Sequence, residues 1–222
     1  MGRAEDTRRF DPPADPRPED GEWPAMVWPV PPGTQLVGPV VRLFLVDPEA
    51  DAEELFAALD HDRVWTHLAG RPASPGALAL TLRDRSDRLG WHQWLVRGAA
   101  DGRVLGTTSY LEVSAADARL EVGATGYTPD VWATAVNPAT KLLVLGFALD
   151  HLLAGRVQLK TDIRNTRSQQ AIARLGATYE GVLRRYQRRG DGTVRDTVLF
   201  SVTAEQWPEV RSGLLARLGS AR

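Results

Sequence analysis

Glu121 is the first residue of this sequence whose type and position could do chemistry. It lies in the run Leu120-Glu121-Val122, where strand alternation sends the two apolar side chains to one face and the carboxylate to the other. A carboxylate held there can accept a proton from an ammonium group, directly or through water. An ordinary solvated carboxylate is the alternative, and without further support it is the commoner outcome.

Asn137-Pro138 marks a helix start that could bind an anion. It follows a strand at 119–127 and a turn at 128–136, so several backbone N–H groups at the helix start lack intrahelical partners. Those donors and the helix dipole suit a diphosphate. The same dipeptide begins helices where nothing binds, so both interpretations stay open.

Ser168 lies in the first turn of a second helix, which Asn165 begins. Asn165 is the expected N-cap, and capping alone explains its presence. The Ser168 hydroxyl could face the gap between the two central strands of the predicted sheet. Serine is also a routine first-turn residue, so this position alone does not decide between structure and chemistry.

The bulk composition narrows the function classes. The chain has 222 residues with 27 basic and 28 acidic side chains, a formal charge of −1, which gives no reason to expect DNA, RNA or an anionic membrane as a partner. The absence of cysteine excludes disulfides, thiolate metal sites and a cysteine nucleophile. The four histidines show no metal-like spacing, so we expect no metal. Almost every basic residue is arginine, and the only lysines are Lys141 and Lys160. We attribute this scarcity of lysine to a genomic preference for arginine.

Location and domain organisation follow from the polar and apolar stretches. Residues 1–20 are polar, and the most apolar stretch, 142–153, is too short to span a bilayer, so we expect a cytoplasmic protein. Many prolines predict a partly disordered Pro-rich arm at 1–35, followed by a single domain at 36–222. The apolar residues that could dock this arm on the domain are Trp23, Met26 and Trp28.

Apolar periodicity and turn residues predict the order β-α-α-β-β-β-α-β-α-β-β, followed by a terminal helix. The predicted strands are 40–46, 91–97, 103–113, 119–127, 156–161, 178–187 and 194–202, and the predicted helices are 52–59, 76–83, 139–153 and 165–175. An antiparallel meander that meets a β-α-β-α unit indicates the mixed α/β class.

Together these segments resemble the GNAT superfamily of N-acetyltransferases, and within it the RimJ/RimL-like branch, over about residues 36–210. Three groups of motifs carry the resemblance through their joint order and spacing. They are Glu121-Val122-Gly123 with 132–137; Lys160-Thr161-Asp162 with Asn165-Thr166-Arg167-Ser168-Gln169; and 174–177, 180–185, 191–192 and Arg195-Asp196-Thr197.

The resemblance implies a central, mostly antiparallel sheet that is splayed between its fourth and fifth strands, with helices on both faces. It implies acetyl-CoA as co-substrate, with a pyrophosphate loop at 132–137 and pantetheine inserted as a pseudo-strand in the splay. The family places an asparagine against the cofactor, here Asn165, and a serine near the sulfur, here Ser168. The implied cofactor-binding residues are Trp132, Ala133, Thr134, Ala135, Val136, Asn137, Lys141, Asn165 and Ser168.

Two features depart from the family pattern. Glycines usually let the loop backbone approach the phosphates, whereas Ala133, Ala135 and Asn137 stand here. Alanine is small and can adopt a helical turn, so we expect binding to survive. Many members also have a tyrosine four residues after the serine. Ile172 stands there, which leaves the proton-donor role to Ser168 or to water.

We therefore expect an N-acetyltransferase that moves an acetyl group to a primary amine by direct attack in a ternary complex, with Glu121 and Ser168 as catalytic residues. The acceptor, a protein N-terminus or a small-molecule amine, stays open, and a homodimer is a further option. A catalytically silent acyl-CoA-binding or interaction module is the alternative from another class. The acceptor pocket is expected from 52–85 and 178–202, with Trp65, Arg71, Trp91 and Tyr186 in its walls.

Overall fold

The fold is built on one central sheet of eight strands within the described residues. The computed structural model describes residues 11–15, 25–68 and 70–220. Within them, eight strands form one sheet in the order β1-β2-β3-β4-β5-β6-β8-β7, in which only β5 and β6 run parallel. The strands are β1 Gln35–Val37, β2 Val41–Leu45, β3 His92–Gly98, β4 Val104–Ser114, β5 Arg119–Tyr127, β6 Arg156–Asp162, β7 Thr178–Arg188 and β8 Val194–Thr203.

Six α-helices accompany this sheet in the part of the chain that the structure describes. They are α1 Ala52–Leu59, α2 Asp62–Trp65, α3 Pro75–Asp87, α4 Val136–Gly146, α5 Thr166–Ala173 and α6 Trp207–Gly219, with a 3-10 turn η1 Pro129–Val131 and a π-helical turn η2 Phe147–His151. None of the helices within these described ranges is long and apolar enough to cross a lipid bilayer.

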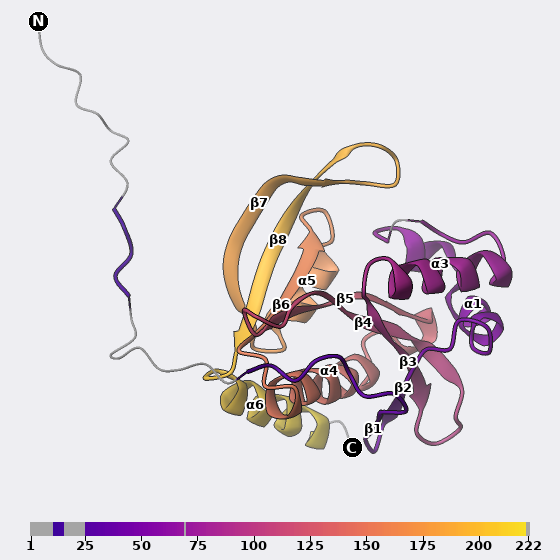
Figure 1. Ribbon diagram of the computed structural model, residues 1–222, viewed down its shortest axis with the longest axis horizontal. Coiled ribbons are helices and arrows are strands. Elements are labelled where there is room, and N and C mark those ends of the chain that lie inside the picture. The colour runs from indigo at the N-terminus through magenta and orange to yellow at the C-terminus, as the bar shows by residue number, and fades with distance from the viewer. Residues whose placement is uncertain (1–10, 16–24, 69, 221–222) are drawn as a thin grey trace, which may run out of the picture.

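Two apolar clusters cover opposite faces of the sheet. Leu95 of β3 packs into a cluster with α1, α2 and α3, whereas its neighbours Trp94 and Val96 pack into a larger cluster with α4 and α6. Successive strand residues point to opposite sides, so these helices lie on two faces, called the α1 face and the α4 face below. Figure 1 shows the hairpin of β7 and β8 curving away from the rest of the sheet.

Most predicted elements are confirmed within a few residues. The mixed α/β class and the seven predicted strands are confirmed, and α1 has the predicted bounds. The Ser74 hydroxyl caps α3 by accepting a hydrogen bond from Ala77 N at 3.2 Å. The prediction missed β1, α2 and η1, whose three or four residues are too few for a period to be read.

The start predicted for the helix at 139–153 is wrong by a few residues. The α4 helix begins at Val136 rather than at Asn137-Pro138, because the Thr134 hydroxyl accepts a hydrogen bond from Val136 N at 3.3 Å. Asn137 and Pro138 therefore lie inside the first turn, where a proline removes no needed donor.

The end predicted for that helix is also wrong. The α-helical hydrogen bonding stops at Gly146, and the chain continues as the π-helical turn η2. Leu153, with φ 57°, takes the left-handed conformation after it. The N–H of Gly155 donates to Ala118 O at 2.7 Å and so joins the segment to the turn before β5.

The sheet opens between β5 and β6. Parallel pairing joins residues 119–121 to residues 156–158, and beyond Glu121 the described part of β5 has no partner on its β6 side. Ala124, with φ 48°, lies where the register between β4 and β5 shifts, and a bulge of this kind bends a strand. The splay expected between the fourth and fifth predicted strands is thus confirmed, and we call this opening the fork.

The described end of the N-terminal arm packs against the domain. Val27 N donates to Leu152 O at 2.8 Å, Met26 is buried, and the Trp28 ring lies 4.4 Å from that of His92. The docking expected for Met26 and Trp28 is therefore observed. Trp23 and most of the predicted arm at 1–35 lie outside the described residues.

Candidate active site

A cavity of about 1180 Å³ lies along the fork and joins the two faces of the sheet. A pocket for one small ligand typically has roughly 300–1,000 Å³, so this space has room for two. Ala135 and Val136 do not line it, and Val136 is buried in the core. The other predicted site residues do line it: Glu121, Trp132, Ala133, Thr134, Asn137, Lys141, Asn165 and Ser168.

Glu121 is a buried carboxylate, so the solvated alternative is wrong. It is 5% exposed, and its Oε2 lies 2.8 Å from the Nζ of Lys160. Burial raises the pKa of Glu121, and the Lys160 ammonium partly opposes this. Gly123 leaves the space that the carboxylate uses, because a Cβ there would lie 2.6 Å from Glu121 Oε1.

Lys160 joins two carboxylates on the α1 face. Its Nζ donates to Glu112 Oε2 at 2.6 Å and to Tyr186 Oη at 2.9 Å, in addition to its ion pair with Glu121. Burial works against its charge, but the two carboxylates and Tyr186 outweigh it and raise the pKa of Lys160. Lys160 is therefore a permanent cation of this site.

Lys141 is buried on the opposite face of the sheet. Its Nζ donates to Thr125 Oγ1 at 2.9 Å and to Thr108 Oγ1 at 3.3 Å, and the two hydroxyls lie 2.7 Å apart. Burial lowers the pKa of Lys141 to about 7, although the charge of Glu121 opposes the shift. A compositional preference does not account for the position of either lysine, since both are buried beside the fork.

The loop at 132–137 offers free backbone donors. The N–H groups of Ala133, Ala135 and Asn137 make no hydrogen bond within the described part of the chain. Ala135 takes the helical conformation expected for alanine, with φ −67°. For Ala133 that expectation is wrong, because its φ of 62° is in the left-handed region that favours glycine.

Trp132 holds two guanidinium groups beside these amides. Its Nε1 donates to Tyr127 O at 2.9 Å, and Arg63 and Arg167 lie 4.7 and 3.8 Å from its ring centre. Neither arginine has an acidic partner among the residues that the structure describes. The indole therefore gathers positive charge next to the free donors of the loop.

The first turn of α5 closes the same end of the cavity. Asn165 Oδ1 accepts a hydrogen bond from Ser168 N at 3.0 Å, which confirms the predicted N-cap. The Ser168 hydroxyl has no hydrogen-bond partner within the described ranges and faces the cavity, as does Ile172. The structure thus brings Ser168 to the cavity that also holds Glu121.

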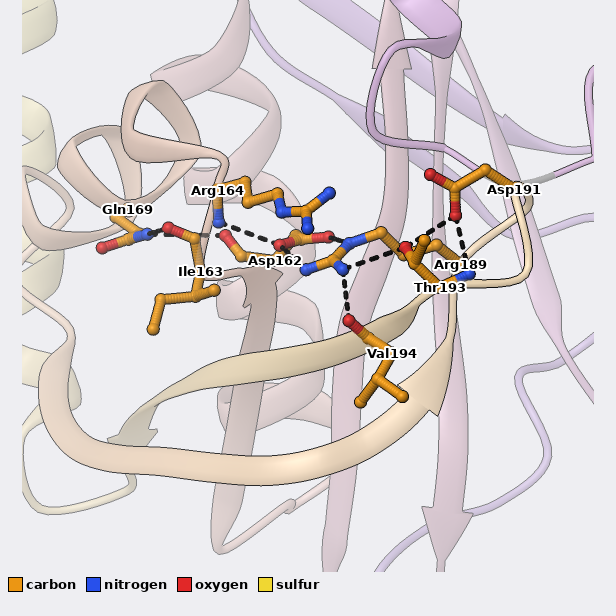
Figure 2. Close-up of polar contacts among 8 residues, drawn as sticks. All are labelled: Asp162, Ile163, Arg164, Gln169, Arg189, Asp191, Thr193 and Val194. Atoms are coloured by element: carbon orange, nitrogen blue, oxygen red, sulfur yellow. Dashed lines mark hydrogen bonds and ion pairs between the residues drawn. The ribbon is translucent and has the colours of Figure 1, made fainter.

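An ion pair ties the hairpin of β7 and β8 to the turn before α5. Figure 2 shows Arg189 binding Asp162 with two nitrogens, at 2.5 and 2.9 Å, while Arg164 N donates to Asp162 Oδ1 at 2.8 Å. The Arg189 guanidinium holds the pKa of Asp162 down at about 2. Arg189 also contacts Thr193 and the carbonyl of Val194, which fixes the hairpin end.

Two of the four residues predicted for the acceptor walls line the cavity. They are Trp65 and Trp91. Arg71 does not line it, because Asp60 and Asp62 hold its guanidinium at 2.7 and 2.5 Å on the surface. Tyr186 meets the site through Lys160 rather than as a wall.

Lys160 and Arg195 both line the cavity, although neither was predicted to have a role in the site. For Lys160 the signal was available in the alternation of β6, where Arg156, Gln158, Lys160 and Asp162 take every second place opposite Val157 and Leu159. In β8 the alternation is interrupted by Leu199, so it gave a weaker signal for Arg195. No cluster of three or more His, Cys, Asp or Glu residues that could hold a metal occurs in the residues that the structure describes.

Comparisons with known proteins agree with this geometry. Residues 42–178 match the family described as an acetyltransferase (GNAT) domain. A proposed acetyltransferase from T. thermophilus shares 34% identity at a TM-score of 0.77, covering 86% of this chain and 100% of that one. A GCN5-related N-acetyltransferase from Brucella melitensis shares 25% identity at a TM-score of 0.79, covering 87% and 89%.

A more distant solved structure shares the fold. The ribosomal-protein-S5-alanine acetyltransferase from Vibrio fischeri is 16% identical at a TM-score of 0.65, covering 78% of this chain and 98% of that one. No curated protein matches the chain.

Proposed function

The chain belongs to the GNAT acetyltransferase family, and on that premise we propose that it moves the acetyl group of acetyl-CoA to a primary amine by direct attack in a ternary complex. Membership of the family makes it an acyltransferase. The observation that carries the proposal is the cavity at the fork, which connects the free amides at the start of α4 with the buried carboxylate of Glu121.

The α4 end of the cavity suits the diphosphate of acetyl-CoA. The free N–H groups of Ala133, Ala135 and Asn137 and the helix dipole favour an anion there, and Arg63 and Arg167 add positive charge. Thr134 shapes this loop through its contacts with Val131 O and Val136 N. The unpaired edge of β5 beyond Glu121 would take the pantetheine arm, as the family pattern implies.

Asn165 and Ser168 would act along the pantetheine arm and the sulfur, whereas Lys141 would support β5. Lys141 gives its hydrogen bonds to Thr125 and Thr108, so we assign it to the support of β5 rather than to a phosphate. Asn165 caps α5 through its Oδ1, which leaves its amide nitrogen for the cofactor. The free hydroxyl of Ser168 would meet the sulfur.

Glu121 would act as the base of the reaction. A primary ammonium has a pKa of about 8–10.4 and must lose a proton before it attacks. Burial raises the pKa of Glu121 toward that of its proton source, while the Lys160 ammonium opposes this shift and favours the ionised carboxylate. An ionised carboxylate in the cavity can then take the ammonium proton, directly or through water.

The remaining steps balance the bonds and protons. The amine nitrogen forms a bond to the thioester carbonyl carbon, and a backbone N–H on the open edge of β5 would stabilise the charge on the oxygen. The carbon–sulfur bond then breaks. Ser168 or water supplies a hydrogen bond or a proton to the leaving thiolate, since Ile172 stands where many relatives have a tyrosine.

The acceptor is an amine at a protein N-terminus or on a small molecule. The Vibrio fischeri enzyme, whose name gives a ribosomal protein as its substrate, supports the N-terminus and with it the RimJ/RimL-like branch, through shared fold alone. A cytoplasmic location and a single acetyltransferase domain at 36–222 belong to the same proposal.

The test separates an active enzyme from a silent acyl-CoA-binding module, which the strained Ala133 and the missing tyrosine at Ile172 would favour. Calorimetry with acetyl-CoA measures binding, and a thiol reagent then measures CoA release with a panel of amines and peptides. We expect binding and amine-dependent release with a matching mass gain. Binding without release would favour the silent module, and folded protein without affinity for acetyl-CoA would overturn the proposal.

A further inference from the structure

Arg195 of β8 is a cation of the fork without a partner. It is half-buried and lines the cavity, and its Nε is buried without a hydrogen-bond partner. The guanidinium makes no ion pair within the described part of the chain. Burial lowers the pKa of Arg195, yet a guanidinium stays protonated in proteins. A desolvated and unpaired charge is unfavourable unless a ligand compensates it.

The pairing register puts Arg195 on the same face of the sheet as Glu121. Glu121 pairs with Gln158 of β6, and Asp162 follows four positions later on that face. Asp162 pairs with Thr197 of β8, and Arg195 lies two positions before it. Arg195 therefore stands just beyond the end of β6, where β8 borders the fork and no β6 residue pairs with it.

The carboxylates nearest to Arg195 are already engaged. Asp162 and Glu121 are its electrostatic neighbours, but Arg189 binds Asp162 with two nitrogens and Lys160 binds Glu121. The partner of Arg195 is therefore missing from the described chain rather than turned away from it.

The charges around Glu121 balance before any acceptor binds. The carboxylates of Glu112 and Glu121 face the Lys160 ammonium and the Arg195 guanidinium. An acceptor with only an ammonium group would add a net positive charge to this half-buried cluster. An acceptor that also carries a carboxylate would bring no net charge and would supply the partner that Arg195 lacks.

The excess of basic over acidic side chains in the cavity also favours an acceptor that carries a negative charge. Eleven of its lining side chains are Lys or Arg and four are Asp or Glu, counted within the described ranges, although the chain as a whole carries a net charge of −1. The phosphates of acetyl-CoA would meet the cations near α4 and α5. Arg195 lies on the α1 face with Glu121.

We propose that Arg195 binds an anionic group of the acceptor, so that the preferred substrate is an amine that also carries a carboxylate, such as an amino acid or a peptide with an acidic residue near its N-terminus. This inference rests on the proposed function and narrows its acceptor. The amine gives its proton to Glu121 while the carboxylate accepts hydrogen bonds from the planar guanidinium. Arg195 is thereby a specificity-determining residue.

The kinetic test compares peptide acceptors that differ only by Asp or Asn at the second position, which keeps the basicity of the amine the same. We expect the wild-type kcat/KM to favour the acidic peptide by about 10- to 100-fold, the range of a hydrogen bond to a charged group. Arg195→Gln should remove most of this preference by raising KM for the acidic peptide, and Arg195→Lys should retain part of it.

Arg184→Gln is the matched control, because Arg184 is an exposed arginine of the same hairpin that does not line the cavity. Its preference should equal that of the wild type. A wild-type enzyme without preference for the acidic peptide would overturn the proposal. Equal losses for both peptides in Arg195→Gln would overturn it as well.

A binding experiment keeps this inference distinct from the proposed function. Calorimetry with CoA-saturated protein compares the N-acetylated acidic peptide with its neutral counterpart, and requires no turnover. Tighter binding of the acidic product that Arg195→Gln abolishes supports the role of Arg195, even if acetyl transfer fails. Equal binding of both products overturns it, whether or not amines are acetylated.

Discussion

The two faces of the sheet at the fork each hold one of the two lysines of this chain, and the two lysines differ in what surrounds them. Lys160 on the α1 face lies between carboxylates at 2.6 and 2.8 Å, which raise its pKa. Lys141 on the α4 face meets only threonine hydroxyls at hydrogen-bond distance, and burial lowers its pKa to about 7. The same side chain is thus a fixed counter-ion in one place and a titrating group in the other.

The difference teaches that burial alone does not decide the protonation state of an ionisable group. Both ammonium groups are nearly inaccessible to water, and the charge of the partner decides which form is stable. The α1 face, where Glu121 would meet the acceptor, is a compensated ionic cluster. The α4 face carries hydroxyls and a lysine whose pKa is about 7. The two faces should therefore respond in different ways to substitution and to pH.

Glu121→Gln is expected to give the largest effect. Loss of the base should lower kcat at neutral pH by about 100-fold or more, the range of general base catalysis, with partial recovery at high pH as the free amine becomes populated. Rate measurements across pH check this. Glu112→Gln removes the other carboxylate of Lys160 and should cost far less, so equal losses in the two variants would remove Glu121 from the role of base.

Lys160→Met is expected to affect both stability and the pH profile. Removing one member of a buried pair typically costs about 3–5 kcal/mol, which denaturant unfolding measures. Without the ammonium the pKa of Glu121 should rise further, so the acidic limb of kcat/KM should move to higher pH. Lys160→Arg keeps the charge and should keep the limb near its wild-type position. An unmoved limb in Lys160→Met would show that Lys160 does not set the ionisation of Glu121.

Lys141→Met should change how stability depends on pH. The pKa of Lys141 is about 7 in the fold and about 10.4 in an unfolded chain, so between these values only the unfolded chain binds the proton. The free energy of unfolding of the wild type should therefore rise with pH in this window, by up to about 1.4 kcal/mol per pH unit.

Unfolding titrations from about pH 7 to about pH 10 should show this slope in the wild type and lose it in Lys141→Met. Lys160 gives the opposite sign, because its raised pKa stabilises the fold below the unfolded value and loses that contribution only as pH rises further. A slope that survives in Lys141→Met would assign it to another group.

Ala133→Gly is expected to give the smallest effect. Ala133 has φ 62°, a conformation that costs a non-glycine residue about 1–2 kcal/mol, and the extra freedom of glycine in the unfolded chain offsets part of the gain. Thermal or denaturant unfolding should show a gain of about 0–1 kcal/mol. Ala135→Gly is the control, because helical Ala135 gains nothing and should lose stability. Destabilisation by both changes would contradict the strain at Ala133.

Much of the fold follows from the sequence because its signals are local. Strand alternation predicted seven strands within a few residues, and Asn165 marked a helix start that the structure confirms. The early start of α4 was missed because it depends on the hydroxyl of Thr134, a residue that reads equally well as loop. Short elements such as β1 carry too few residues to show a period.

The site was less predictable because its chemistry depends on contacts between distant segments. Alternation predicted which way Glu121 points, but its burial and ion pair need Lys160, which is 39 positions later in the printed sequence. Arg71 was predicted as a wall residue, but its ion pairs with Asp60 and Asp62 hold it on the surface. The roles of Ser168 and the loop amides stay predictions, which acetyl-CoA binding and kinetics can test.

The contact between Arg189 and Asp162 bears on how this enzyme could be re-engineered. It fastens the tip of the β7–β8 hairpin to the turn that carries Arg164 and leads into Ser168. A hairpin transplanted from a relative to alter acceptor choice would release that turn unless it brought an arginine at position 189. Libraries that randomise the hairpin should therefore hold this one arginine constant and vary its neighbours.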